Sequence, residues 1–546
     1  FSNKLYEHNI INIFQVTKPN KQLSFNISDA NHKIERIAFK AVEKILGPNS
    51  AILEANKYQR APITNDDLVN DMFRNNRTGV PRCTDSHYLK TLDYVKNLIT
   101  TSKPLKTIHF TGTRFYSLNN SGSAELPYVN DPSFKRHISN RFKRGEISDT
   151  RLTKGNGKNY ILAKERIKVH QIKDKVFTFE QMLYDTRMHA RSHLTLAEAA
   201  AKVRAVYGVC CTLIFIEIML LWPLMAHLRA TSSFIAWGYE TFRGGLERLR
   251  QELIGYAYHF SLDFSTFDKL IPFWLIDDVH SLWHSLYEIG TYYEDDPRYR
   301  RPSTSPRRIL NLWEFMNWAV KHQVYRAPDG SRYKRRHSGI PSGLLQTQLL
   351  GSFCNAIVVL SALSSIGINL EDIHFRVLGD DGHYSIVLKY QLTPNNLKDI
   401  SDYCLLHFGA IINVEKSTFN CGSENLSFLS YQFHNGAVRR VHDDLIGKLL
   451  LPEHSNLRVE TTKSRAMGIL VANLGYSREI HLICLDILEY LAQVEMDSSE
   501  FDWYDKQKFE SIFKTLRTTP TRRDLFTLAR TINFIPGDQE FIKYIR

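Results

Sequence analysis

Two stretches of the chain alternate apolar and polar residues in the way that β-strands do. Residues 256–263 alternate and then pass into an amphipathic stretch that continues through Trp283, and this change of period predicts a strand followed by a helix. In residues 375–388, two apolar runs flank a Gly-Asp-Asp-Gly cluster. Because Gly and Asp tolerate the positive φ angles of tight turns, this stretch predicts a β-hairpin with its aspartates at the tip.

Longer apolar stretches predict helices. A loop of small residues at 338–348 leads into a run with apolar residues at helix spacing, and residues 479–494 show the same periodicity. Residues 206–225 are apolar over nearly the roughly 20 residues that span a bilayer. Glu217 lies in the middle of this run and Pro223 near its end, so we expect a buried helix and not a membrane span.

Composition adds a basic character to this picture. The 546 residues carry a net charge of +13, and 43% of them are hydrophobic, which suits several subdomains with substantial cores and a polyanionic partner. Seven cysteines, an odd number, fit a reducing compartment better than a disulfide framework. The spacing of Cys404, His407, Cys421 and His434 is too loose to favour zinc.

Three aspartates stand where the predicted strands end. Asp263 closes the first strand, and Asp380 and Asp381 occupy the hairpin tip. Carboxylates from two strands are the minimum protein contribution to a site for two divalent cations, and hard oxygen ligands suit Mg²⁺. From these residues alone two alternatives stay open: a solvated turn at the tip, and helix capping by Asp263, Ser265 or Asp268.

The loop at residues 338–348 is a third candidate element. The loop and the helix after it carry Ser342, Thr347 and Asn355, whose hydroxyl and amide groups can bond a sugar or a template backbone. Glycines let such a loop approach a substrate closely. A glycine-rich loop in front of a core helix is the alternative interpretation.

In this order the three elements resemble motifs A, B and C in the palm of viral RNA-dependent RNA polymerases. The matching stretches are residues 263–268, 338–355 and 379–381. Other stretches resemble further motifs of the same family: 123–128 motif G, 202–204 motif F, 413–417 motif D, and 428–433 with the turn at Asn435 and Gly436 motif E. The string from Ile340 to Asn355, with residues 263–272 and 236–240, is most similar to partitiviruses, which are small double-stranded RNA viruses.

Two positions depart from the family pattern. Glu125 replaces the usual glycine of motif G, which would set a carboxylate near the expected template path. Many related polymerases carry an asparagine four residues after the motif B threonine, where this chain has Gly351. Asn355 lies one helical turn further along the same face, from which it could take over sugar recognition.

The resemblance implies roles for particular residues. Asp263, Asp380 and Asp381 would bind Mg²⁺, with Mn²⁺ able to substitute, and Lys416 would protonate the pyrophosphate leaving group. An ordinary surface lysine is the alternative for Lys416. The implied nucleotide-binding residues are Lys202, Arg204, Asp268, Ser342, Thr347 and Asn355, and the implied RNA-binding residues are Ser123, Pro127 and Gly343. Lys334, Arg335 and Arg336 form a basic cluster just before the motif B stretch, and this position favours contact with RNA or the triphosphate.

The residue five positions after Asp263 indicates whether the enzyme prefers ribonucleotides or deoxyribonucleotides. Reverse transcriptases carry an aromatic residue five positions after the first metal aspartate, where it blocks a ribose hydroxyl. This chain has Asp268 there, a small acceptor able to bond the 2′-OH, so the resemblance implies ribonucleotide incorporation. A non-enzymatic RNA-binding or capsid-associated protein would explain the basic charge but would leave Asp263, Asp380 and Asp381 without a role.

The implied fold is α+β, a right-hand polymerase with fingers, palm and thumb, an antiparallel palm sheet backed by helices, and closure by an N-terminal fingertip region. The expected divisions are 1–119 N-terminal, 120–255 fingers, 256–288 palm, 289–337 fingers insertion, 338–440 palm and 441–546 thumb. The expected activity is template-directed RNA synthesis by two-metal nucleotidyl transfer, replicating and transcribing a double-stranded RNA genome. Expected partners are RNA, NTPs and viral capsid protein, without membrane or zinc, in the virion interior or host cytoplasm.

Overall fold

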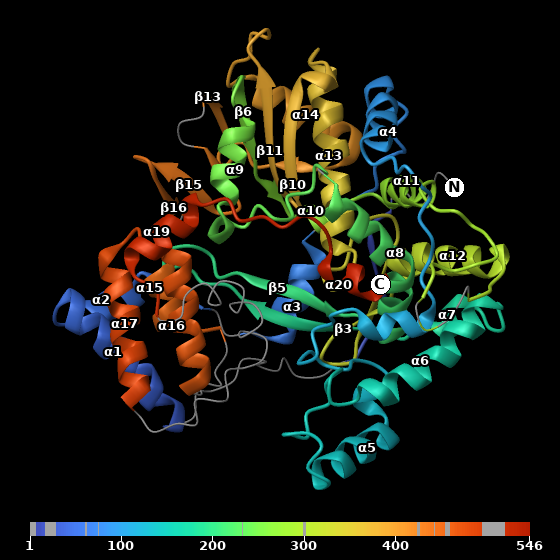
Figure 1. The fold of residues 1–546 in the computed structure, drawn as a ribbon, viewed down its shortest axis with the longest axis horizontal. Helices are drawn as coiled ribbons and strands as arrows, with labels where there is room; N and C mark the ends of the chain where they lie inside the picture. The colour runs from blue at the N-terminus through green and yellow to red at the C-terminus, as the bar shows by residue number, and fades with distance from the viewer. Residues whose placement is uncertain are drawn as a thin grey trace.

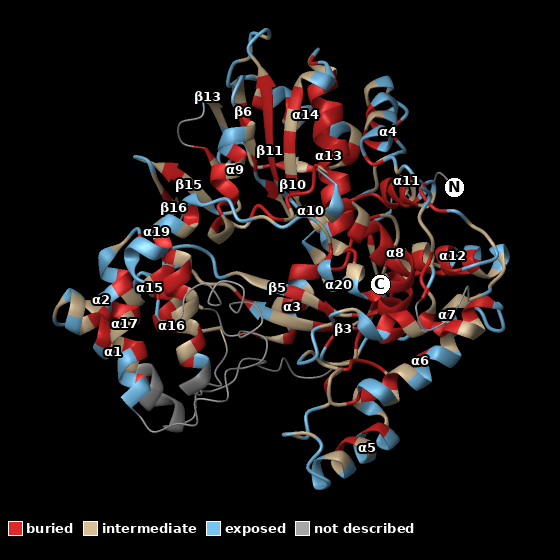
Figure 2. Ribbon diagram, viewed as in Figure 1, coloured by how far each residue is buried: buried red, intermediate tan, exposed pale blue. Residues whose placement is uncertain are grey.

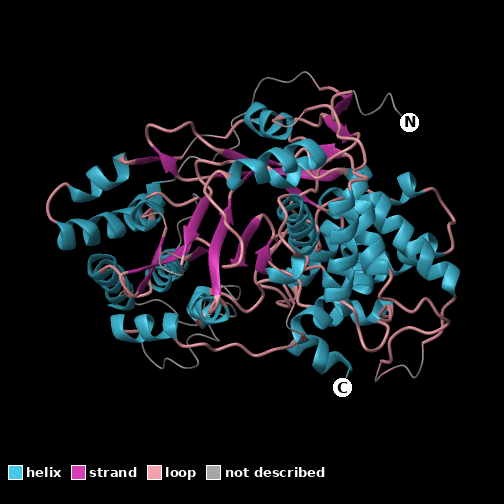
Figure 3. Ribbon diagram, turned by 90° about the horizontal axis from the view of Figure 1, so that it is seen from above, coloured by secondary structure: helices cyan, strands magenta, loops and turns pink. Residues whose placement is uncertain are grey.

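The computed structural model has an α+β fold with two larger sheets and several groups of helices (Figure 1). The structure describes residues 7–16, 29–60, 63–74, 76–231, 233–296, 298, 302–422, 426–441, 443–453, 459–493 and 519–545. One sheet lies at the top of Figure 1, and the other crosses the lower middle of the molecule. Seen from above, the strands lie between two groups of helices (Figure 3).

The upper sheet is entirely antiparallel. Its order is β10 (Ile373–Leu378), β11 (Asp381–Val387), β6 (Tyr256–Leu262) and β13 (Thr418–Cys421). Buried and half-buried residues alternate along β10, as expected when one face of a strand covers a core. α13 (Thr347–Ser365) packs against β10 and β11, and α14 (Asn396–Phe408) packs against α13. The hairpin predicted at residues 375–388 is therefore confirmed.

The helix predicted from residue 264 through Trp283 is interrupted. In its place are β7 (Phe264–Ser265), which pairs with β12 (Ile411–Ile412), and then α10 (Phe267–Leu270) and α11 (Phe273–His284). Pro272 has no N–H to offer a helix. Its neighbours bond instead to the segment before α13: Gly339 N donates to the Ile271 carbonyl, and Phe273 N donates to the His337 carbonyl, both at 2.8 Å.

The lower sheet has five strands in the order β1, β9, β8, β3 and β5. They are β1 (Ile10–Phe14), β9 (Arg332–Arg335), β8 (Tyr325–Arg326), β3 (Thr186–Ser192) and β5 (Val203–Gly208). All pairs are antiparallel except β3 with β8. α3 (Asn65–Phe73) packs on β5 and brings an N-terminal segment beside it.

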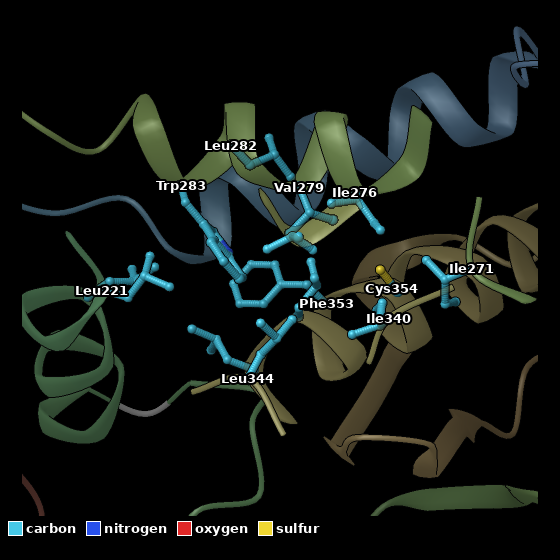
Figure 4. Close-up of a cluster of buried hydrophobic side chains, with 14 of the residues drawn as sticks. Leu221, Ile271, Ile276, Val279, Leu282, Trp283, Ile340, Leu344, Phe353 and Cys354 are labelled. Atoms are coloured by element: carbon cyan, nitrogen blue, oxygen red, sulfur yellow. The ribbon is translucent and has the colours of Figure 1, made fainter. Parts of the chain in front are cut away.

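The longest apolar run forms α8 (Cys211–Ala230). Among the described residues, α8 and α13 are the two helices long and apolar enough to cross a membrane, and 94% and 89% of their apolar windows are buried. Figure 2 shows both helices in the buried interior. Phe353 of α13 meets Trp283 of α11 edge to face, with ring centroids 5.5 Å apart (Figure 4). Both are therefore core helices, as predicted for residues 206–225.

A separate core joins the N-terminal helices to C-terminal ones. Its buried residues come from α1 (Asp29–Leu46), α2 (Ser50–Asn56), α15 (Leu445–Leu450), α16 (Val459–Asn473) and α17 (Arg478–Gln493), with Leu525 of α19 (Arg522–Arg530). Because β1 also pairs with β9, the N-terminal part of the chain contacts both the lower sheet and this helical group.

The end of the chain leaves that helical group. α20 (Gln539–Ile545) packs against α8, and the rings of Phe541 and Tyr544 each lie 5.2 Å from the ring of Trp222. Residues 441–546, expected as one unit, thus end in a helix that belongs to another core.

The remaining elements connect these layers. The helices are α4 (Ser86–Leu98), α5 (Pro132–Lys143), α6 (Lys158–Lys173), α7 (Phe179–Met182), α9 (Gly245–Glu252) and α12 (Pro306–His322). A small sheet holds β14 (Ser427–Phe428), β15 (Tyr431–His434) and β16 (Ala437–Arg440), and β2 (Tyr58–Gln59) pairs with β4 (Thr195–Leu196). Asn435 and Gly436 have positive φ angles of 50° and 74° and form the predicted hairpin turn between β15 and β16.

Candidate active site

A two-residue turn presents the adjacent aspartates. Leu378 of β10 pairs with Asp381 of β11, so Gly379 and Asp380 form the turn, and Gly379 has a φ of 65°. Such positive φ angles are inexpensive for glycine. Both Asp380 and Asp381 are exposed, which leaves their carboxylates available to a ligand.

Asp263 lies beside this turn. Leu262 pairs with Gly382, so the residue that follows β6 stands next to the start of β11. Partial burial raises the pKa of Asp263, and the Asp380 carboxylate adds to the rise, while Lys416, Lys202 and Arg204 oppose it. Asp263 and Asp380 therefore influence each other's charge, although they belong to different strand ends.

Neighbouring carboxylates also act on Asp381. Although Asp381 is exposed as a residue, desolvation by the surrounding chain, together with the carboxylates of Asp380 and Asp263, raises the pKa of Asp381 to about 6. A cation would relieve this repulsion. In the described part of the chain no three carboxylate, imidazole or thiol groups converge into a preformed metal cage. One or two carboxylates with substrate phosphates are the usual protein share of a Mg²⁺ site, so these aspartates fit a metal that arrives with its substrate.

Basic side chains near the start of β5 face the aspartates. Lys202 directly precedes β5, and Arg204 is the second residue of this strand. Burial lowers the pKa of Lys202, together with the charges of Arg204, Arg74 and Lys416. Asp263 acts in the opposite direction on the Lys202 pKa. Residues 202–204 and Asp263, which are 59 or more positions apart, are therefore neighbours in space.

The exposed Lys416 is held near Asp263 by main-chain bonds. Asn413 N donates to the Asp263 carbonyl at 2.8 Å, and Asp263 N donates to Ser417 Oγ at 3.0 Å. Ser417 Oγ in turn donates to the Asn413 carbonyl at 2.8 Å. The turn at residues 413–417 is thus fixed to the end of β6, which accounts for the influence of Lys416 on the Asp263 pKa.

Asp268 also belongs to this cluster. Burial raises its pKa to about 6, with a contribution from Asp380 and an opposing one from Arg204. Its main-chain carbonyl accepts a hydrogen bond of 2.6 Å from Ile340 N. The first and second sequence elements are therefore joined directly through the backbone.

The loop before α13 packs tightly on β5. Tyr207 N donates to the Ser342 carbonyl at 2.9 Å, and a Cβ on Gly343 would lie 1.9 Å from the Tyr207 carbonyl oxygen. Thr347 Oγ1 donates to the Pro341 carbonyl at 2.8 Å and accepts a weak bond from Gly343 N at 3.4 Å. Gly343 is needed for this close approach, and the Thr347 hydroxyl holds the loop closed.

Asn355 does not face a substrate. Its side chain is completely buried, and its amide donates to the carbonyls of Gly379 at 3.0 Å and Asp380 at 2.9 Å. Its side-chain oxygen accepts a hydrogen bond of 2.8 Å from Tyr384 Oη. The sugar-recognition role considered for Asn355 is therefore replaced by a structural one, because every group that could bond a sugar already has a partner.

Arg335 also differs from its expected role. It is only 5% exposed, and its guanidinium donates to the carbonyls of Gly339, Val320 and Lys321 and lies over the rings of Phe273 and Tyr325. This buried side chain supports the loop from behind and cannot reach RNA. Lys334 and Arg336 are half-buried, and Arg336 pairs with Glu7.

The motif G-like segment carries its carboxylate inward. Glu125 is 4% exposed, its carboxylate meets Arg187 at 3.5 Å and His189 at 3.1 Å, and it packs against Gly208. Although burial opposes ionisation, these partners leave the pKa of Glu125 below its usual value. The carboxylate expected near a template path thus points into β3 and β5, while Ser123 and Pro127 are half-buried on the same segment.

Asp71 and Lys269 form a pair near the site that the motifs of the sequence do not include. Asp71 is buried on α3 and accepts a hydrogen bond of 2.8 Å from Ala205 N of β5. Lys269 Nζ meets the same carboxylate at 2.7 Å. This pair fixes β5 to α10, and its only sequence signal is an aspartate within the apolar pattern of residues 65–73.

Comparisons with known proteins agree with this geometry. A model of the viral RNA-dependent RNA polymerase family matches residues 76–459. The RNA-directed RNA polymerase of Atkinsonella hypoxylon virus is 27% identical over 79% of this chain and 71% of its own length, and that of White clover cryptic virus 1 is 24% identical over 85% and 83%. Both are partitivirus enzymes, so the resemblance seen in the sequence is confirmed.

A solved structure shares the fold. The Sicinivirus 3Dpol RNA-dependent RNA polymerase superposes with a TM-score of 0.61 over 94% of this chain and 100% of its own, at 13% sequence identity. The family match covers well over half of the chain and includes Asp263, Asp380 and Asp381. The chain therefore belongs to the viral RNA-dependent RNA polymerases and is an RNA-directed RNA polymerase of the partitivirus-like kind.

Proposed function

We propose that the chain forms a polymerase hand around the upper sheet. The palm would comprise residues 256–288 and 338–440, the fingers 120–255 and 289–337, and the thumb the helices after residue 441, with α20 returning to the fingers. Residues 1–119 would close the hand, because β1 pairs with β9 while α1 packs on α17.

The catalytic centre would be the three aspartates at the ends of β6 and β11. Asp263 and Asp380 would hold two Mg²⁺ ions, with Asp381 as an auxiliary ligand and Mn²⁺ as a substitute. When bound, these ions would activate the attacking hydroxyl and stabilise the departing pyrophosphate. The observation that carries this proposal is the strand register, which sets the end of β6, and so Asp263, beside the turn and the start of β11 that hold Asp380 and Asp381. Lys202, Arg204 and Lys416 act on the Asp263 pKa from the other side.

Basic side chains of this chain would bind the triphosphate of the incoming nucleotide. Lys202 and Arg204 would neutralise its charge and hold it in line, since phosphoryl transfer depends mostly on positioning and electrostatics. Lys416, fixed beside Asp263, would donate a proton to the pyrophosphate as it leaves.

Substrate selection would use neighbouring groups. Asp268 would accept a hydrogen bond from the ribose 2′-OH, next to Ser342 and Thr347 in the loop that packs on β5. Ser123, Pro127, Gly343, Lys334 and Arg336 would contact RNA.

The biological task would be replication and transcription of a double-stranded RNA genome. This proposal rests on the two partitivirus relatives. A capsid protein would be the partner, and synthesis would take place inside the particle in the host cytoplasm.

The test is Mg²⁺-dependent RNA synthesis on a single-stranded RNA template. Asp380→Ala should lower NTP incorporation by about 10³-fold or more, because several kcal/mol of transition-state stabilisation would be lost. Asp402→Ala, which removes an exposed aspartate of α14, is the matched control and should keep parent activity. Unchanged activity in Asp380→Ala would refute the assignment, and incorporation of dNTPs instead of NTPs would indicate reverse transcription.

A further inference from the structure

One pair of helices carries most of the chain's net charge. Residues 132–173, which span α5 and α6, contain twelve Lys and Arg against three Asp and Glu, a surplus of nine within a total of +13. α5 itself contains no acidic residue. Charge of this density in less than a tenth of the chain is more than solubility requires.

The two helices present this charge outward. Phe134 of α5 is buried, and its ring lies 5.3 Å from that of Tyr128 and 5.4 Å from that of Tyr160 of α6. Ile138, one turn further along α5, is also buried. The opposite faces expose Lys135, Arg136, Lys143 and Lys164. Figure 1 shows α5 and α6 extending from the lower edge of the molecule, and Figure 2 shows their outer faces exposed.

The carboxylates of this segment do not neutralise those four cations. Glu165 is buried and pairs with Lys168, Glu146 pairs with Arg141 and Arg144, and Asp149 pairs with Arg151. Within the described residues, Lys135, Arg136, Lys143 and Lys164 form no ion pair. Lys164 instead lies 5.7 Å from the centre of the Tyr160 ring.

The link between the helices reaches the motif G-like segment. Ala124 N donates to the Leu152 carbonyl at 2.8 Å, and Lys154 N donates to the Gly122 carbonyl at 2.9 Å. Lys154 Nζ also donates to the Ser123 carbonyl at 2.8 Å. The basic helices are therefore continuous with Ser123, a residue assigned above to template contact.

We propose that the outer face of α5 and α6, defined by Lys135, Arg136, Lys143 and Lys164, binds the phosphate backbone of single-stranded template RNA before it reaches the active site. The inference rests on the proposed function for the position of the template. Unpaired cations on a projecting surface bind a polyanion without regard to sequence, and the contribution depends steeply on salt. The neighbouring contact with Ser123 favours RNA over an acidic protein as the occupant.

The experiment compares two variants of equal charge change. One carries K135E, R136E, K143E and K164E, and the control carries K90E, K96E, K103E and K398E, four exposed lysines that also form no ion pair in the described structure. Affinity for single-stranded RNA of about 40 nucleotides is measured over a range of salt concentrations, because each phosphate contact contributes about 0.7 to the salt slope. Extension of a primer on a template with an overhang of only a few nucleotides is measured in parallel.

The first variant should bind the long RNA about 10-fold or more weakly and lose about 3 units of salt slope. Its extension of the short template should match the parent, and the control variant should match the parent in both assays. Equal weakening by both variants would overturn the proposal in favour of a net-charge effect. Unchanged long-RNA affinity would also overturn it, and unchanged affinity with lost capsid incorporation would assign the surface to a protein. Failure of the parent to extend either template would instead concern the proposed catalytic function, because RNA binding is measured separately.

Discussion

The side chain of Asn355 on α13 donates a hydrogen bond of 2.9 Å to the main-chain carbonyl of Asp380. The same helix supplies Ser352 Oγ, which accepts a bond of 2.8 Å from Gly379 N. Gly351 lies against the turn, where a Cβ would be 3.5 Å from Gly379 Cα. One face of α13 therefore holds the turn that presents the aspartates, and an asparagine one helical turn beyond the usual family position performs a structural task.

Replacing Asn355 should disable the turn without changing sugar selection. Asn355→Ala leaves two partly buried carbonyls and the buried Tyr384 hydroxyl without these partners, so we expect stability to fall by about 2–3 kcal/mol and the polymerisation rate to drop. The ratio of kcat/KM for ATP to that for dATP should stay at the parent value. Tyr384→Phe, which removes one of these bonds, should cost about 1 kcal/mol. If Asn355→Ala lowers the ratio of kcat/KM for ATP to that for dATP, Asn355 takes part in sugar recognition and the structural assignment is wrong.

Asp268 should govern that ratio instead. Asp268→Ala removes the acceptor proposed for the 2′-OH, and the loss of a hydrogen bond to a charged group costs about 1.5–3 kcal/mol, or about 10- to 100-fold in discrimination. The measurement is kcat/KM for ATP and dATP under identical conditions. Asp268→Asn keeps an acceptor and should retain most of the selectivity. An Asp268→Ala enzyme with parent discrimination would exclude this role.

Lys416 should act as a proton donor. Lys416→Leu should slow the chemical step by about 100-fold or more, in the range of a lost general acid, with little change in KM for NTPs. Lys416→Arg keeps the charge beside Asp263 but cannot give up a proton near neutral pH, so it should be nearly as slow. Single-turnover rates at saturating NTP measure this step. Parent rates in Lys416→Arg would show that charge alone matters, and Lys398→Leu on α14 is the surface control.

Local patterns were enough to predict the elements that carry the aspartates. The hairpin at Gly379 and Asp380 follows from residues adjacent in the chain, and so does the strand that ends before Asp263. Backbone conformation at such turns depends on the turn residues themselves, so the structure agrees with these local predictions.

Other features of the site depend on tertiary contacts, which local sequence patterns do not predict. Pro272 marks the helix break locally, but the partners of its neighbours, residues 337–339, lie more than 60 positions away and have no local signal. Arg335 reads as an exposed cation in the sequence, but it is buried because three carbonyls and two rings surround it. The Asp71 and Lys269 pair joins α3 to α10, and no periodic pattern indicates such a partner.

The loop before α13 is held by an ionisable group inside the core. Glu217 of α8 is completely buried, and its carboxylate accepts hydrogen bonds from Leu345 N at 3.0 Å and from Gln346 N at 3.3 Å and Nε2 at 2.8 Å. Gln346 Oε1 lies 2.6 Å from His280 Nε2. The residue that argued against a membrane span in the sequence thus anchors the start of α13.

This burial should make stability depend on pH through Glu217. Burial raises the Glu217 pKa from 4.5 to about 7, although the three hydrogen bonds oppose the rise. The native state therefore binds this proton more tightly than the unfolded chain, so its contribution to the free energy of unfolding is largest below pH 4.5, decreases as pH rises to about 7, and is constant above. The full change is about 3 kcal/mol. Urea unfolding of parent and Glu217→Gln at pH 5 and pH 8 measures it: the parent should lose up to this amount relative to the variant. Glu371→Gln, at an exposed position, should follow the parent at both pH values, and parallel curves for parent and Glu217→Gln would refute the coupling.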